Sequence, residues 1–112
     1  MGPNELDDIL NSLKPLLDNL WEQLPEVNKV LAKRSFDNIV DLAEQYAKAK
    51  IQGDEGAMKR TQRSLEHSIT ALISIVISGI AALEDPVKEA ASNLGLRIIS
   101  VLVTKLFGAV RS

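Results

Sequence analysis

SITALISIVISGIAAL, from Ser68 to Leu83, holds sixteen consecutive residues without a charge, and five of them are isoleucine. An α-helix of sixteen residues rises only about 24 Å, whereas a membrane-spanning helix needs about 20 apolar residues to cross about 30 Å of hydrocarbon. Ionisable residues stand close to both ends, with Glu66 upstream and Glu84 downstream. We therefore favour either the buried spine of a helical bundle or a seam for a partner over a membrane span.

Three helix-breaking points divide the chain, at Pro25, at Gly53–Gly56 and at Asp85–Pro86. Proline suits the first turn of a helix, aspartate its N-cap and glycine its exit. No stretch alternates apolar and polar residues for long enough to predict a strand. We therefore predict one all-α domain, a four-helix bundle whose neighbouring helices are antiparallel or sharply bent because their connections are short. The domain covers residues 1–112, and its helices are expected at about 4–24, 25–52, 54–84 and 85–108.

Leucines recur at heptad spacing through the first predicted helix. They are Leu6, Leu10, Leu13, Leu17, Leu20 and Leu24. Pro15 lies on the polar side, where it removes one backbone hydrogen bond and predicts a kink. The leucine row continues in register beyond this proline, which favours one kinked helix over two short ones. In so short a chain the row favours intramolecular core over a dimer zipper.

The overall composition excludes several classes of function. The 112 residues include 13 basic and 15 acidic side chains, a net charge of −2, which gives no electrostatic support for nucleic-acid binding. The absence of cysteine excludes disulfides, thiolate metal sites and cysteine nucleophiles. The N-terminus is acidic and lacks the basic region and apolar run of a signal peptide, so we expect a cytoplasmic protein.

Residues suited to catalysis or to cofactor binding are few. The chain has no Glu-x-x-His motif of the kind that di-iron bundles use. The Gly53–Gly56 turn lacks the preceding strand and the Lys-Ser/Thr ending of a phosphate-binding loop. His67 is interpreted as a residue on a helix face at the edge of the packed half, with a pH switch as the alternative. We predict no catalytic residue, metal site or cofactor, and hence no enzyme.

The third and fourth predicted helices carry more apolar surface than one bundle needs. In the third, Thr70, Ser74 and Ser78 form a narrow hydroxyl strip that excludes only Ser68, and the surrounding surface is apolar. The fourth has a single thin polar stripe. Leaving three isoleucines exposed would forgo roughly 1.5–3 kcal/mol each, which together rivals the stability of a small domain, about 5–15 kcal/mol. The surplus is therefore covered either by the other three helices or by a second subunit.

We predict a non-enzymatic interaction or structural protein whose last two helices bind a second copy, most simply as a dimer, or another protein. The candidate interface residues are Ile73, Ile75, Ile77, Ser74, Ser78, Gly79, Leu102 and Phe107. We expect the Leu72–Val76 side to face its own bundle and the Ile73–Ile77 flank to face the partner. The alternative is a bundle that holds a lipid or another apolar ligand between its helices, or engages a membrane surface, with Arg97 and Lys105 near its entrance.

Overall fold

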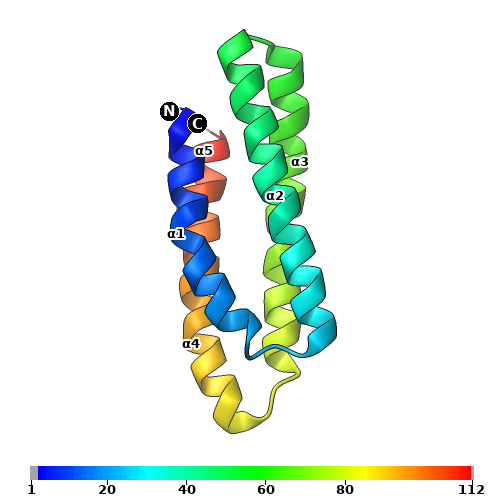
Figure 1. Cartoon of the computed structure of the whole chain (residues 1–112), viewed down its shortest axis with the longest axis vertical. Helices are drawn as coiled ribbons and strands as arrows, with labels where there is room; N and C mark the ends of the chain where they lie inside the picture. Colours follow the sequence, from blue (N-terminus) through cyan, green and yellow to red (C-terminus); the bar gives the residue numbers. More distant parts are fainter. Residues whose placement is uncertain (1–2, 112) are drawn as a thin grey trace.

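Four antiparallel helical runs make up the molecule, as predicted (Figure 1). The computed structural model describes residues 3–111, and the side chains of residues 5–111. The runs are α1 (Pro3–Trp21), α2 (Glu26–Gln52), α3 (Glu55–Ala81) and a last run of α4 (Asp85–Val101), the π-helical segment η1 (Leu102–Phe107) and α5 (Gly108–Arg111). No strand occurs in the described part of the chain. The all-α, four-helix-bundle prediction is therefore confirmed.

The helices form two antiparallel pairs, α1 with the last run and α2 with α3, and the second pair is longer (Figure 1). α2 and α3 pack against each other along their whole length, and their connecting turn projects beyond the start of α1 and the end of α5. α1 lies beside α4 and η1, and the bundle measures 49 × 21 × 17 Å. Two hydrogen bonds join α2 to Ser68 of α3: Asn38 Nδ2 donates to Ser68 Oγ at 2.9 Å, and Ser35 Oγ donates to the backbone Ser68 O at 3.4 Å. This contact with α2 is why Ser68 stands apart from the outward hydroxyl strip.

The turn between α2 and α3 follows from two residues. Gly53 has φ 70°, the left-handed conformation that glycine adopts without steric cost, and its N–H reaches the carbonyl of Lys50 at 3.2 Å. Asp54 then caps α3, since its Oδ1 accepts a hydrogen bond from Ala57 N at 3.1 Å. The boundary predicted at Gly53–Gly56 is confirmed.

The predicted helix ends differ from the structure by a few residues. α1 ends at Trp21, and the following residues make turn hydrogen bonds, including Leu24 N to Trp21 O at 3.3 Å, before Pro25 starts the next run. α3 ends at Ala81, three residues before the predicted end. The last run continues past Gly108 to Arg111. α1 is one helix through Pro15, whereas the kink at this residue stays a prediction.

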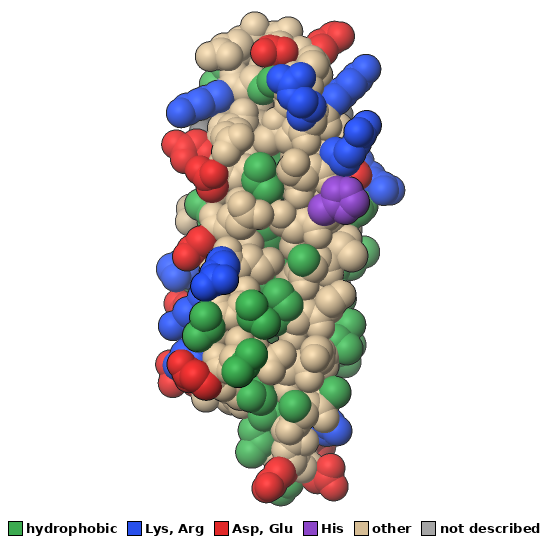
Figure 2. All heavy atoms as spheres, turned by 90° about the vertical axis from the view of Figure 1, so that its right-hand side faces the viewer, with side chains coloured by type: hydrophobic (Ala, Val, Ile, Leu, Met, Phe, Trp, Pro, Cys, Tyr) green, Lys and Arg blue, Asp and Glu red, His purple; other side chains and the backbone are tan. Residues whose placement is uncertain are grey.

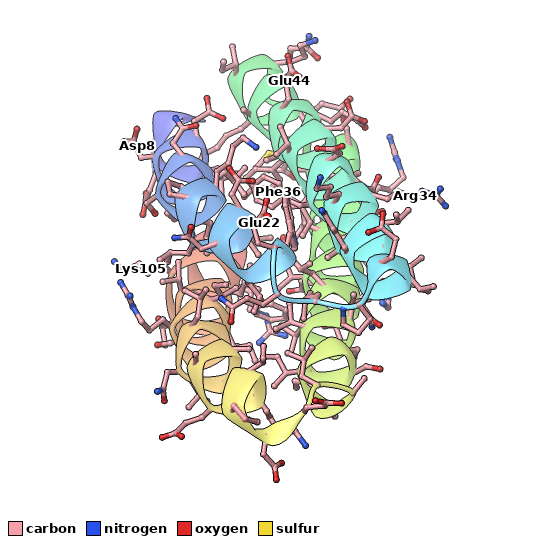
Figure 3. All side chains as sticks on the ribbon, turned by 60° about the horizontal axis from the view of Figure 1, so that its bottom comes forward. Asp8, Glu22, Arg34, Phe36, Glu44 and Lys105 are labelled. Atoms are coloured by element: carbon pink, nitrogen blue, oxygen red, sulfur yellow. The ribbon has the colours of Figure 1, made fainter. Side chains whose placement is uncertain are left out.

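The core is built mainly from the leucine row of α1 and the inward row of α3. All six leucines of that row are buried, which confirms their role as intramolecular core. Leu72 and Val76 are fully buried, so this side of α3 faces its own bundle as predicted. Trp21 packs edge-on against Phe36, with ring centroids 6.1 Å apart. Figure 3 shows Phe36 between the helices, while Asp8 and Arg34 point outward.

Gly79 marks a close contact between the end of α3 and the start of α2. A Cβ atom at this position would lie 2.9 Å from Leu24 Cδ2 and 3.1 Å from Asn28 Cβ. The Leu24 methyl group can rotate away, but Asn28 Cβ is fixed to the α2 backbone. A side chain at position 79 therefore requires Asn28 on α2 to shift by a few tenths of an ångström.

We expect Gly79→Ala to lower the free energy of unfolding by about 1 kcal/mol, because overpacking of about 1–3 kcal/mol outweighs a helix-propensity gain of about 1 kcal/mol. Gly108→Ala is the matched control, since a Cβ there meets nothing within 4 Å, and it should raise stability by about 0.5–1 kcal/mol. Urea unfolding followed by far-UV circular dichroism at one low protein concentration measures both. Equal stabilisation by the two substitutions would contradict the tight contact.

Candidate association surface

A shallow apolar hollow lies between α3 and α4, with a volume of about 280 Å³. It is lined by Ile77, Ile80, Ala81, Ser92, Gly95, Leu96 and Ile99. Gly95 forms part of its floor, because a Cβ atom there would collide with Ile80 Cδ1. The missing side chain thus lets Ile80 lie against the α4 backbone. The hollow owes its shape to this glycine, and Ser92 is the one hydroxyl in its lining.

Exposed apolar side chains flank the hollow on both helices. Ile77 on α3 is 54% exposed, and Leu96 on α4 is 67% exposed. Ile73 and Val103 lie one or two turns further along the same sides by helical spacing, and Val103 is 50% exposed. We call the hollow with Ile73 and Val103 the α3–α4 face. This face combines a recess with protruding apolar side chains, and exposed apolar patches of this kind are typical of sites where proteins associate.

The structure brings only some of the predicted interface residues to this face. Ile77 is exposed and lines the hollow, while Ile73, Ile75 and Phe107 are partly buried against the core. Ile75 lies about 200° around the helix from Ile77, so the two do not share a face. Ser74 and Ser78 are exposed between these flanks.

Two of the predicted interface residues are corrected by their burial. Leu102 is 0% exposed, because it continues the inward row of the last run with Ile98 and Leu106. Gly79 is buried where α3 packs against the start of α2. Both contact their own bundle and are inaccessible to a partner.

Sequence reasoning missed most of the lining of the hollow, on α3 as well as on α4. The unrecognised residues are Ile80, Ala81, Ser92, Gly95, Leu96 and Ile99. The signal on α4 was the spacing of Ser92, Leu96 and Ile99 along one side of the helix, next to a glycine that permits close helix approach. In a helix that is apolar nearly all round, that spacing does not stand out.

A second group of exposed apolar residues lies on α2. It comprises Val27, Val30 and Leu31, and Val27 is 71% exposed. Figure 2 shows hydrophobic side chains over the middle and lower part of the side formed by α2 and α3. This α2 group is the main rival of the α3–α4 face as a contact surface.

Two threonine hydroxyls, one in the hydroxyl strip of α3 and one on the last run, donate to carbonyls of their own helices. Thr70 Oγ1 donates to Glu66 O at 2.9 Å, and Thr104 Oγ1 donates to Ser100 O at 2.6 Å. Such bonds to the carbonyl four residues earlier are usual for threonine in helices. These hydroxyls therefore need no hydrogen bonds from a partner.

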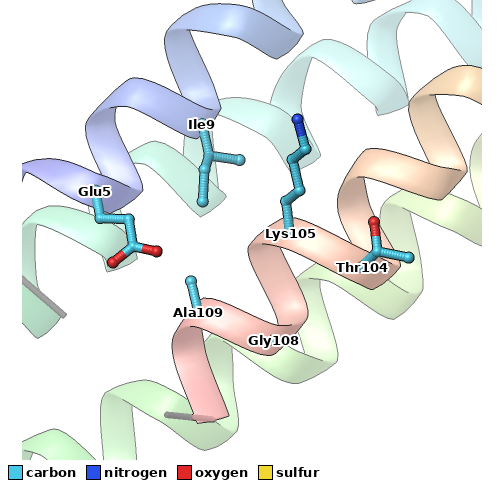
Figure 4. Close-up of a pocket in the computed structure, with 6 residues that line it drawn as sticks. All are labelled: Glu5, Ile9, Thr104, Lys105, Gly108 and Ala109. Atoms are coloured by element: carbon cyan, nitrogen blue, oxygen red, sulfur yellow. The ribbon is translucent and has the colours of Figure 1, made fainter.

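A larger hollow of about 390 Å³ lies between α1 and the end of the last run (Figure 4). Figure 4 shows Glu5 and Ile9 on α1 approaching Ala109, with the Lys105 side chain on the far side of Ile9 from the Glu5 carboxylate. Its lining is a mixture of charged and apolar groups that do not converge on one point. It offers a lipid tail no dry surface of the kind found between α3 and α4.

The described residues include no group of three or more His, Cys, Asp or Glu side chains that could hold a metal ion.

Another hollow of about 410 Å³ lies where the α2–α3 hairpin projects past α5. Tyr46 and Met58 line it together with the charged residues Glu55, Lys59 and Arg111. The surface of this third hollow is polar and apolar in similar measure, unlike the almost wholly apolar hollow between α3 and α4.

Two helical runs are long and apolar enough to cross a membrane by length and composition. They are Glu55–Ala81 and Asp85–Arg111, each with a mean hydropathy of 1.5 in its most apolar window. The same runs supply Leu72, Val76 and Ile98 to the core, and core helices of soluble bundles have this composition too.

Compared with known proteins, the chain matches no family model, no curated protein and no solved structure.

Proposed function

We propose that the protein is a non-enzymatic interaction protein that associates through its α3–α4 face, either with a second copy or with another protein. The observation that carries this proposal is the apolar hollow between α3 and α4, flanked by the exposed side chains of Ile77 and Leu96. Burying a large aliphatic side chain fully is worth about 1.5–3 kcal/mol. Ile77, Leu96 and Val103 keep half or more of their surface exposed, so a partner would gain a large part of that energy from each.

The chemistry of the hollow supports association over catalysis. Active sites combine an apolar pocket with several polar groups that converge on one point. Here Ser92 is the one polar side chain in the lining. Such a surface excludes water and packs against other apolar groups, but it offers no acid, base or nucleophile pair for a reaction.

A concentration series in the analytical ultracentrifuge tests self-association of the unmodified chain. From about 1 µM to about 500 µM, a range that covers typical affinities of modest interfaces, we expect the average mass to rise from 12.2 kDa towards twice that value. A mass that stays at 12.2 kDa throughout would contradict self-association. The proposal would then depend on a different protein partner.

A second candidate function is engagement of a membrane by the α3–α4 hairpin. It is favoured by the two apolar runs of spanning length. Insertion would remove the inward row of α3 from the bundle core, where Leu65, Ile69 and Leu72 are fully buried. Flotation with vesicles of phosphatidylcholine and phosphatidylglycerol separates the candidates, because an association protein stays in the dense fraction and a membrane protein floats.

A further inference from the structure

We propose that the α3–α4 face binds a second copy of this chain, with the two copies antiparallel across a two-fold axis near Ile99. This inference rests on the proposed function and adds the identity and orientation of the partner. It is carried by the arrangement of charge around the apolar middle of the face.

Basic side chains predominate at the upper end of the face, near the α2–α3 turn. The ionisable residues on this side are Lys59, Arg63, Arg111, Glu55 and Glu66. Lys59 lies eighteen residues from Ile77, which is five full turns, so the two share one side of α3. Glu66 is already paired, since its Oε1 lies 2.8 Å from Arg111 Nε. Three basic groups against two acidic ones leave this end positive.

Acidic side chains predominate at the lower end, where α3 connects to α4. The ionisable residues there are Glu84, Asp85, Glu89 and Lys88. The three acidic side chains are exposed, whereas Lys88 is half-buried. Figure 2 shows acidic side chains at the lowest point from the neighbouring side, whereas basic side chains near the top are mixed with a few acidic ones. This end of the face is therefore negative.

The apolar middle lies halfway between these two charged ends. Ile99 follows Asp85 by fourteen residues and precedes Arg111 by twelve, which is about 21 Å and about 18 Å along the helix. A two-fold axis through this point places the apolar middle of one copy on that of the other, and each negative end on a positive end. A parallel pair would instead bring like charges together, which is repulsive. The face is thus complementary to itself in the antiparallel orientation, as a two-fold interface requires.

Single-cysteine cross-linking tests the orientation directly, because the chain has no cysteine of its own. We expect oxidised Ile99→Cys protein to form disulfide-linked dimers with itself. Arg111→Cys and Glu89→Cys, which lie on the same helical run about 18 Å and about 15 Å from Ile99, should cross-link with each other when mixed, but neither with itself. Self-linking of both end variants would show a parallel pair and overturn the inference, while leaving the proposed function intact.

Charge reversal provides an independent measure. Lys59→Glu with Arg63→Glu makes both ends negative, and Glu84→Lys with Glu89→Lys makes both ends positive. Each double variant should dimerise about tenfold more weakly than the unmodified chain, and an equimolar mixture should recover the affinity as a heterodimer. Circular dichroism confirms that each variant is folded. If neither reversal changes the affinity, or if the mixture fails to recover it, the inference is wrong.

The failures of the two proposals have different signatures. A chain that remains monomeric at every concentration overturns the antiparallel dimer. A chain that dimerises, but whose association is weakened by substitutions in the Val27 group of α2 rather than on the α3–α4 face, overturns both the inference and the proposed surface. If the chain is monomeric and floats with the vesicles, the result supports membrane engagement instead.

Discussion

Leu17→Ala is expected to lower the free energy of unfolding by about 2–5 kcal/mol. Leu17 lies in the middle of the leucine row of α1 and is 0% exposed. Truncation removes the transfer energy of the lost methyl groups and leaves a cavity that close-packed neighbours fill only in part. Because a small domain is stable by about 5–15 kcal/mol in total, this single change consumes a large share of the stability.

Leu16→Ala is the matched control for this experiment. It changes the same residue type in the next position of the same helix, but Leu16 is only partly buried at the edge of the core. We expect a loss well below that of Leu17→Ala, because less surface returns to water and no enclosed cavity forms. Urea unfolding measured by far-UV circular dichroism gives both values. Equal losses would show that the leucine row does not form the core as described.

The sequence was sufficient to predict the helical class and most boundaries, because these depend on local signals. The leucine spacing marked the buried side of α1, and Gly53 with Asp54 marked the tightest turn. The end of the last run was misplaced at Gly108. Glycine commonly ends a helix, but Gly108 has helical dihedral angles, φ −62° and ψ −42°. Glycine permits an ending without requiring it, and here the chain continues so that Ala109 and Val110 are buried.

The candidate surface was predictable only in part. The third helix is amphipathic enough to fix the inward side, so Leu72 and Val76 were placed correctly and Ile77 was identified as outward. The fourth helix is apolar nearly all round, so its sequence pattern did not indicate which side faces the core. Leu102 was therefore assigned to the surface and Leu96 was overlooked. The orientation of such a helix depends on its neighbours. Here the close approach of Gly95 to Ile80 determines it, and that contact exists only in the folded chain.

Leu96→Glu is expected to weaken self-association by about 100-fold or more, while leaving the monomer folded. Leu96 is 67% exposed, so the substitution costs the isolated bundle little, and glutamate is a good helix former. In a symmetric dimer the change occurs twice, and each carboxylate would enter an apolar contact in which Ser92 is the only nearby lining hydroxyl. Sedimentation of the variant across the same concentrations as the unmodified chain measures the loss.

Val27→Glu is the matched control, because Val27 is 71% exposed but belongs to the α2 group away from the α3–α4 face. A glutamate there lies in the first turn of α2, where the helix dipole favours it, so both folding and association should be unchanged. Thermal unfolding at low concentration verifies that the two variants have equal monomer stability. If Val27→Glu dissociates the protein and Leu96→Glu does not, the partner sits on α2, and the hollow between α3 and α4 is not the contact surface.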